Sequence, residues 1–151
     1  MNRFSVFKFY PAMQPLVDLG KNVREAGRLE PALIDLVLMR VSQINGCAFC
    51  LDMHSKDARA AGETDQRLHL LPAWRETKLY NERERIALAW AEELTKLASP
   101  EALPDALYAQ AREQFEEAAL VDLTLLVVTI NGWNRLNIAA RTIGGNYKAA
   151  A

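Results

Sequence analysis

The chain has 151 residues, a formal net charge of −1, 50% hydrophobic residues and 25% charged residues. This composition is typical of one globular domain and excludes a disordered or fibrous chain. Because the chain has no surplus of positive charge to neutralise phosphates, the composition also argues against nucleic acid as a partner.

The apolar runs of the sequence are short. Residues 1–10 carry Arg3 and Lys8 among aromatic residues and lack the apolar stretch of a secretory signal. The longest apolar run, residues 123–130, contains two threonines and is far shorter than the ~20 residues that span a bilayer. We therefore expect a cytoplasmic protein without a membrane partner. In that reducing compartment, two cysteines three positions apart are typically catalytic or metal-binding.

Helical signals dominate the chain, so we expect an all-α fold. A first helix is predicted from Gln14-Pro15 to Gly27, and a second from Pro31 to Asn45-Gly46, with its proline at the first helical position. The second helix is apolar on most sides, which is typical of a buried helix. A third is predicted from about Cys47 to Ala61, with Gly62 as its cap.

The second half of the chain also reads as helical. A short helix is predicted to start at Thr64, followed by a loop. Asn81 and Glu84 have the spacing of a capping box and predict the start of an amphipathic helix. On its exposed side, we expect Glu92 and Lys96 to form an i,i+4 pair.

Two further helices follow a break at Ser99-Pro100 and Pro104. One is predicted to run through Phe115, and the last to cover residues from about 117 to 141. Gly144-Gly145 is predicted to end the ordered part of the chain.

Two parts of the chain resemble each other in sequence. Each has an apolar segment with a central aspartate, followed by an Ile-Asn-Gly triplet: Ala32–Leu36 with Ile44–Gly46, and Ala119–Leu123 with Ile130–Gly132. A duplicated helical hairpin would explain the similarity, since each copy can bury its apolar face against the other; chance similarity of two apolar helices is the alternative. We expect one domain over residues 1–151, with a core at about 31–62 and a degenerate second repeat at about 117–142.

The first copy alone carries Cys47, Cys50 and His54, which share one face of the predicted helix. Residues three apart on a helix lie ~5–6 Å from each other, within reach of a disulfide. Because Gly46 is expected to end the preceding helix, both cysteines fall in a new first turn, where free N–H groups and the helix dipole favour an anion. This position lowers a thiol pKa below its ordinary ~8.5 and makes the sulfur nucleophilic.

Three interpretations of this motif remain open from the residues alone. The first is a dithiol redox site, for which all the visible parts are present. The second is a zinc site with Cys47, Cys50, His54 and, as a fourth ligand, His69, although the spacing matches no common zinc finger. The third is a pair of buried cysteines beside a core histidine. Haem attachment is excluded because Leu51, not histidine, follows the second cysteine.

Residues 35–54, followed by Ala60-Ala61-Gly62-Glu63, resemble the core motif of AhpD-like alkylhydroperoxidases in the carboxymuconolactone decarboxylase superfamily. The similarity extends to residues 82–90 and 123–135. The resemblance implies a single-domain helical bundle of the AhpD-like type, built on a duplicated helical hairpin. It also implies a thiol-dependent peroxidase, with peroxiredoxin-type activity in antioxidant defence.

The resemblance also implies roles for the site residues. Cys50 would attack the terminal peroxide oxygen and become a sulfenic acid, and Cys47 would resolve it as a disulfide. His54 would transfer protons. The family has a glutamate twelve residues before the first cysteine, and this chain has Asp35 there, one methylene shorter.

Asp35 also has a purely structural interpretation. The second copy has Asp122 at the same place without any thiol. A carboxylate here can therefore serve structure, for example by pairing with Arg40 or Arg135. A catalytic role and a structural role for Asp35 both stay open at this point.

The partners implied are a small hydroperoxide and a dithiol or protein reductant, without a cofactor or a bound metal. By resemblance to the family, we expect a homo-oligomer, a trimer or a hexamer. The aromatic residues at the start of the chain would then pack on a neighbouring subunit. Two alternative functions are a carboxymuconolactone decarboxylase-like enzyme and a non-catalytic redox-sensing protein.

Overall fold

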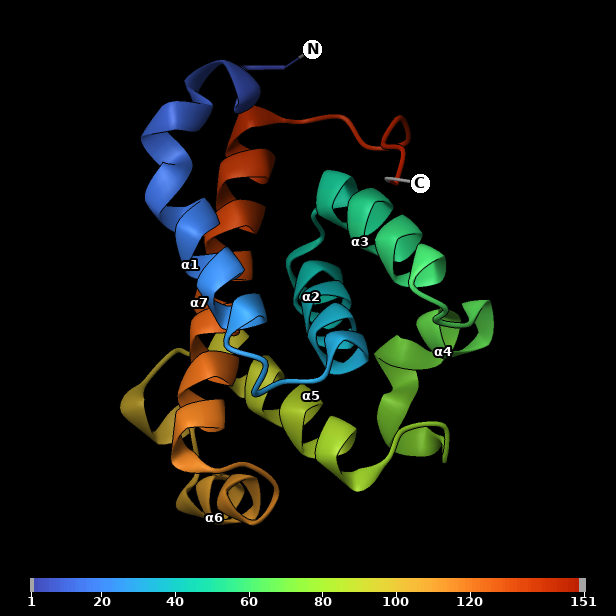
Figure 1. The fold of residues 1–151 in the computed structure, drawn as a ribbon, viewed down its shortest axis with the longest axis vertical. Helices are drawn as coiled ribbons and strands as arrows, with labels where there is room; N and C mark the ends of the chain where they lie inside the picture. The colour runs from blue at the N-terminus through green and yellow to red at the C-terminus, as the bar shows by residue number, and fades with distance from the viewer. Residues whose placement is uncertain (1, 150–151) are drawn as a thin grey trace.

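A computed structural model describes residues 2–149, and within them every regular element is a helix (Figure 1), so the expected all-α class is confirmed. In chain order the elements are η1 (Phe7–Met13), α1 (Gln14–Glu25), α2 (Pro31–Asn45), α3 (Ala48–Ala60), α4 (Asp65–Leu70), η2 (Leu71–Glu76), α5 (Glu82–Thr95), η3 (Pro100–Ala102), α6 (Asp105–Gln114) and α7 (Glu117–Ala140). None of the helices described combines the length and the hydrophobicity that a membrane crossing requires.

The helix ends follow the capping residues of the sequence. Thr64 caps α4 by accepting a hydrogen bond from the backbone N–H of Arg67. Asn81 and Glu84 form the predicted capping box at the start of α5. The segment after α4, predicted to be a loop, forms the 3₁₀ turn η2 instead, because Trp74 packs into the core with 4% of its surface exposed.

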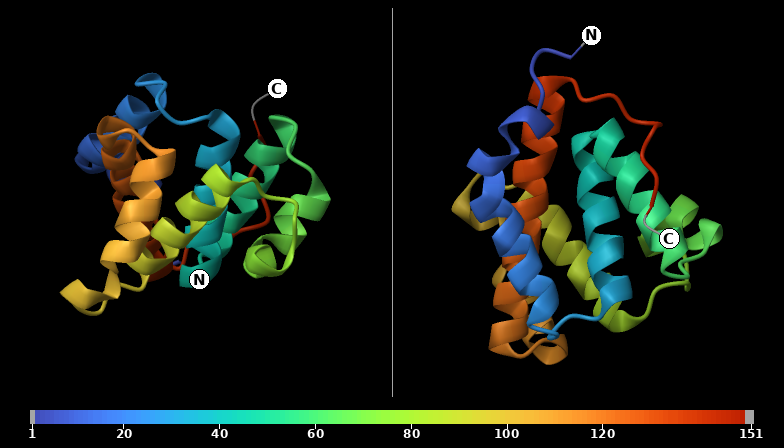
Figure 2. Two further views of the ribbon diagram at one scale, coloured as in Figure 1. Left: turned by 90° about the horizontal axis from the view of Figure 1, so that it is seen from below. Right: turned by 45° about the horizontal axis from the view of Figure 1, so that its top comes forward.

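Helix α2 is the centre of the molecule and packs against α3, α5 and α7 (Figure 1). Helix α1 lies along α7 on the outer side of the bundle (Figure 2). The side chains of α2 are buried on nearly all sides, and Val37 and Val41 are completely buried. A helix that is apolar all round needs neighbours on every side, which explains the position of α2.

The two Ile-Asn-Gly triplets meet in the folded protein. The side-chain amide of Asn45 donates to Asn131 Oδ1 at 3.0 Å and to Asn134 Oδ1 at 2.8 Å. The two triplets differ in backbone, however, because Gly46 has a φ of 68° and ends α2, whereas Gly132 lies inside the continuous helix α7. The second copy therefore forms one helix and not a hairpin.

Glu92 contradicts the prediction of an exposed ion pair on α5. Its side chain is only 2% exposed and accepts hydrogen bonds from Arg40 Nε at 2.7 Å, Trp74 Nε1 at 2.9 Å and Arg75 Nη1 at 2.7 Å. Lys96 also forms the predicted i,i+4 ion pair with Glu92, at the longer distance of 3.8 Å. The predicted pair is thus present, but its predicted place on the exposed side of α5 was wrong, because α2 and η2 cover this side and neither could be placed from the local spacing.

The segment after α7 was predicted to lose order at Gly144-Gly145, but it folds back along α3. The backbone N–H groups of Gly145 and Tyr147 donate to Asp52 Oδ2 at 2.7 and 3.0 Å. The phenol of Tyr147 donates to Asp57 Oδ1 at 2.8 Å. Gly144 passes so close to α3 that a Cβ there would lie 2.7 Å from the carbonyl oxygen of Ala48. These contacts make the segment one wall of the site described next.

Candidate functional site

The two cysteines lie at the N-terminus of α3 and form a disulfide, with their Cα atoms 5.3 Å apart. Gly46 turns the chain out of α2, and Cys47 becomes the N-cap of α3, where its sulfur accepts a hydrogen bond from the backbone N–H of Cys50 at 3.3 Å. The predicted position in a new first turn is therefore confirmed. Each cysteine is only 1% exposed.

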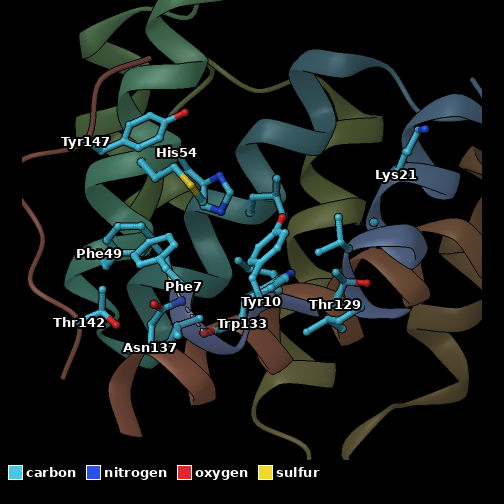
Figure 3. A pocket seen from close by; sticks show the side chains of 18 of the residues that line it. Phe7, Tyr10, Lys21, Phe49, His54, Thr129, Trp133, Asn137, Thr142 and Tyr147 are labelled. Carbon is cyan, nitrogen blue, oxygen red and sulfur yellow. Dashed lines mark hydrogen bonds between the residues drawn. The ribbon is translucent and has the colours of Figure 1, made fainter. Parts of the chain in front are cut away.

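A cavity of about 900 Å³ opens beside the disulfide, and Cys50 and His54 are among the residues that line it. Its walls come from the N-terminal segment with η1, from α1, α2, α3 and α7, and from the C-terminal segment, and they are mainly apolar and aromatic. Figure 3 shows Phe7 next to Phe49, and the rings of these two residues meet edge to face at 5.8 Å. Cys47 does not line the cavity. The two sulfurs therefore differ in access, and Cys50 is the one that a ligand in the cavity can approach.

His54 lies one turn beyond Cys50 on α3, with its ring at the cavity. Burial and, as a smaller effect, the positive charge of Arg24 lower the pKa of His54 from its ordinary value to about 4. The Nε2 atom is buried and has no hydrogen-bond partner among the residues that the structure describes. At neutral pH the imidazole is therefore uncharged, with one nitrogen free to exchange a proton inside the cavity.

The lowered pKa of His54 makes stability depend on pH. Between the folded pKa of about 4 and the unfolded value of ~6.5, the unfolded chain binds more protons, so stability rises with pH in this window. We expect His54 to contribute a loss of about 2 kcal/mol between pH 7 and pH 4.5. Urea denaturation at both pH values should show that His54→Gln lacks this loss.

The matched control is His69→Gln, which replaces the exposed histidine of α4. This variant should keep the wild-type pH dependence of the free energy of unfolding. An unchanged pH dependence in His54→Gln would contradict the assignment of a buried, neutral imidazole.

Asp35 lies buried on α2, and its carboxylate accepts a hydrogen bond from Arg24 Nη2 at 3.3 Å. Burial raises the pKa of Asp35 and outweighs the opposing effect of the Arg24 charge. Asp35 does not line the cavity, whereas Arg24 does. The structure therefore places Asp35 behind Arg24, which also carries the charge that acts on His54.

Asp122 repeats this arrangement in the second copy, with a different arginine. Arg28 donates to both of its carboxylate oxygens, at 2.6 and 3.0 Å. The expected pairing of these aspartates with Arg40 or Arg135 was wrong, because Arg40 binds Glu92 and Arg135 binds Asn131 within its own helix. Both arginines that bind the aspartates come from α1 and the loop after it.

Asn137 of α7 is a site residue that the sequence did not indicate. Its amide nitrogen donates to the carbonyl oxygen of Trp133 at 3.0 Å and lies 3.9 Å from the sulfur of Cys50. Its Oδ1 is buried and has no hydrogen-bond partner within residues 2–149. A single asparagine in an apolar helix does not stand out in the sequence as a site residue. Asn137 reaches Cys50 only because α7 packs against α3.

His69, which was considered as a fourth zinc ligand, lies exposed on α4 and does not line the cavity. In the described part of the chain, no three His, Cys, Asp or Glu side chains are grouped so that they could hold a metal ion. Of the predicted and newly found site residues, the structure brings Cys50, His54 and Asn137 together at the cavity. Cys47 is bonded to Cys50 but does not line the cavity.

Comparisons with known proteins agree with this architecture. The model of the carboxymuconolactone decarboxylase family matches residues 11–93, more than half of the chain. The uncharacterized protein YdfG of Bacillus subtilis is 41% identical over 138 residues, which cover 91% of this chain and 92% of that protein. The uncharacterized protein YnjA of Escherichia coli is 34% identical over 117 residues, which cover 77% of this chain and 63% of that protein.

Solved structures show the same fold. A crystal structure from Agrobacterium tumefaciens, of a protein of unknown function named as a candidate AhpD antioxidant defence protein, is 36% identical and superposes with a TM-score of 0.89 over 97% of this chain and 100% of that one. The debrominase Bmp8 is 21% identical, with a TM-score of 0.79 over 92% of this chain and 74% of that one, and shares the fold alone. The chain therefore belongs to the carboxymuconolactone decarboxylase family and has the fold of its AhpD-like members.

Proposed function

We propose that the protein is a thiol-dependent peroxidase that reduces hydroperoxides in antioxidant defence by cycling Cys47 and Cys50 between dithiol and disulfide. The observation that carries this proposal is the disulfide at the start of α3, whose Cys50 faces a cavity beside a neutral His54. Membership of a family that includes AhpD-like proteins supports it.

In the proposed reaction, the thiolate of Cys50 attacks the terminal oxygen of the hydroperoxide and the O–O bond breaks. Cys50 becomes a sulfenic acid, and the leaving oxygen takes a proton and departs as an alcohol. The thiolate of Cys47 then attacks the sulfur of Cys50 and displaces hydroxide, which takes a proton and leaves as water. The disulfide that results is reduced by two electrons from an external dithiol, which returns both thiols.

His54 and Asn137 have complementary roles in this proposal. The free Nε2 of His54 takes the proton of the Cys50 thiol and returns it to the departing alcohol. The amide N–H of Asn137 points toward the sulfur of Cys50, at 3.9 Å, and favours its thiolate. The free Oδ1 of the same amide can accept the O–H of the bound hydroperoxide.

A catalytic role for Asp35 is tested by substitutions that change only its charge or its length. If Asp35 acts as the relay carboxylate, we expect Asp35→Asn to slow oxidation of the thiols about ten- to a hundredfold near pH 7, and Asp35→Glu to keep or raise the rate. The rate is measured from the loss of free thiols after mixing with peroxide.

The matched control is Asp122→Asn, which removes the equivalent carboxylate from its pair with Arg28 in the second copy. The control should lose stability without a change in the oxidation rate. Equal oxidation rates in the wild type, Asp35→Asn and Asp35→Glu would assign Asp35 to structure alone.

The proposed partners are a dithiol or protein reductant and further copies of the same chain, as a trimer or a hexamer. Apolar side chains on the outside of α7 support an oligomer, since Val121, Val128 and Ile138 are each 45–53% exposed. Phe7 and Phe9 near the start of the chain are also exposed, at 62% and 53%. Large apolar side chains that stay exposed in this way are typical of an interface.

The proposed activity is tested by the loss of hydrogen peroxide and of cumene hydroperoxide in the presence of dithiothreitol. We expect turnover with the untreated protein, and none after its thiols have been reduced and alkylated with iodoacetamide. If thiol analysis shows that dithiothreitol reduces the disulfide and yet no peroxide is consumed, the proposal is rejected. A redox-sensing protein or a decarboxylase-like enzyme would then be the alternatives to test.

A further inference from the structure

The cavity is far larger than the reaction at Cys50 requires. Its volume is about 900 Å³, whereas a water molecule occupies ~30 Å³ of the liquid and hydrogen peroxide has two oxygen atoms instead of one. Pockets that bury whole organic ligands have volumes of ~300–1,000 Å³. The walls are mainly apolar, so a ligand that fills the cavity has a large apolar body.

The charges that line the cavity are all of one sign. Lys21 and Arg24 reach it from α1 and Lys148 from the C-terminal segment, while His54 is neutral. Among the residues that the structure describes, no aspartate or glutamate lines the cavity. A carboxylate that enters the cavity would therefore meet positively charged and no negatively charged residues in its lining.

Two of these cations already contact carboxylates outside the cavity. Lys21 lies 3.6 Å from Glu25, and both side chains of that pair are more than 60% exposed. Such an exposed pair is weak, so a bound anion can compete for Lys21. Arg24 is held more firmly, by the buried Asp35. Among the ion pairs between side chains of residues 2–149, none includes Lys148.

From the volume, the apolar walls and the uniform charge, we infer that the cavity takes unesterified hydroperoxides with a long apolar body and an anionic head group, such as a fatty-acid hydroperoxide. This inference rests on the proposed function, because it names the substrate class of the same site. Lys21 stands apart from the Cys50 side of the cavity, where Phe49 and Asn137 lie (Figure 3). A charged head and a hydroperoxide farther along the chain can thus be accommodated together.

Kinetics with paired substrates test the inference. The probe is a hydroperoxide of linoleic acid below its micellar concentration, compared with its methyl ester, which has the same body without the charge. We expect kcat/KM for the acid to exceed that for the ester about tenfold in the wild type, and about twofold or less in a Lys21→Gln/Lys148→Gln variant. Lys78→Gln removes an exposed lysine elsewhere and should keep the tenfold preference.

A binding measurement separates failure of this inference from failure of the proposed function. The disulfide form cannot reduce a peroxide, so its affinity for the corresponding hydroxy fatty acid, measured by calorimetry, is independent of turnover. We expect the double lysine variant to bind the hydroxy acid about five- to tenfold more weakly than the wild type.

Equal affinities, together with equal rates for acid and ester, would overturn the inference even if hydrogen peroxide is consumed. Lysine-dependent binding without consumption of any peroxide would reject the proposed function and leave a site for amphipathic anions. Faster turnover of a phosphatidylcholine hydroperoxide in vesicles than of the free acid would also overturn the inference, because it would make the lipid and not the free acid the substrate.

Discussion

Replacing Cys50 with serine is expected to lower kcat/KM for hydroperoxides at least about a thousandfold, because the hydroxyl of serine is a far weaker nucleophile than a thiolate. Cys47→Ser should behave differently. Since Cys50 lines the cavity and Cys47 does not, the Cys47→Ser protein should still consume one equivalent of peroxide. It should then stop at the sulfenic acid of Cys50, which has no partner thiol to close a disulfide.

Stopped-flow mixing gives the rate of the first reaction, and mass spectrometry after trapping with dimedone identifies the sulfenic acid. The two variants are matched controls for each other, because both lose the same disulfide. A sulfenic acid that forms on Cys47 of the Cys50→Ser protein at the wild-type rate would reverse the assignment of the two sulfurs.

Glu92→Leu is expected to destabilise the fold by about 3–5 kcal/mol. The carboxylate of Glu92 is 2% exposed and is the common acceptor for Arg40, Arg75 and the indole of Trp74. Leucine would leave the guanidinium of Arg40, itself only 13% exposed, without the charge that balances it. Glu92→Gln keeps an acceptor oxygen and should lose clearly less stability.

Urea denaturation of each variant at pH 7 measures these losses. The matched control is Glu93→Leu, which makes the same change at the next, partly exposed position of α5 and should alter the free energy of unfolding by less than about 0.5 kcal/mol. If Glu92→Leu were as stable as Glu93→Leu, the hydrogen bonds from Arg40, Trp74 and Arg75 to Glu92 would contribute nothing to the free energy of unfolding.

The stabilisation by Glu92 also has a defined pH range. Burial opposes ionisation of this carboxyl, but the hydrogen bonds from Trp74, Arg75 and Arg40 outweigh it and lower its pKa. A carboxyl whose pKa is lowered in the folded state stabilises the fold above its unfolded pKa and loses this effect as the pH falls through the folded one. The difference between wild type and Glu92→Gln should therefore shrink below about pH 4.

Much of the fold could be predicted from the sequence because its signals are local. Pro31, Gly46 and the Asn81–Glu84 box mark helix ends wherever they occur, and the resulting helices are found where expected. The position of Cys47 and Cys50 in the first turn of α3 follows from Gly46 in the same way.

The features that could not be predicted depend on contacts between distant residues. Arg40 and Glu92 are 52 positions apart, so the spacing within α5 predicted the pair of Glu92 with Lys96 but not the shorter hydrogen bond from Arg40. Asn137 reaches Cys50 across 87 positions, and only the packing of α7 against α3 brings them together. The arginines for Asp35 and Asp122 were missed for the same reason, since the path of α1 across the bundle selects them.

The return of the chain along α3 has a practical consequence for biochemistry on this protein. Asn2 and Lys148 come from opposite ends of the described chain, yet both line the cavity at Cys50. Both ends of the described chain are therefore part of the cavity wall, and a polyhistidine tag fused to either end would add imidazoles near a cavity whose described lining holds one histidine, His54. Rate constants and metal analyses are therefore best obtained on protein from which every purification tag has been cleaved.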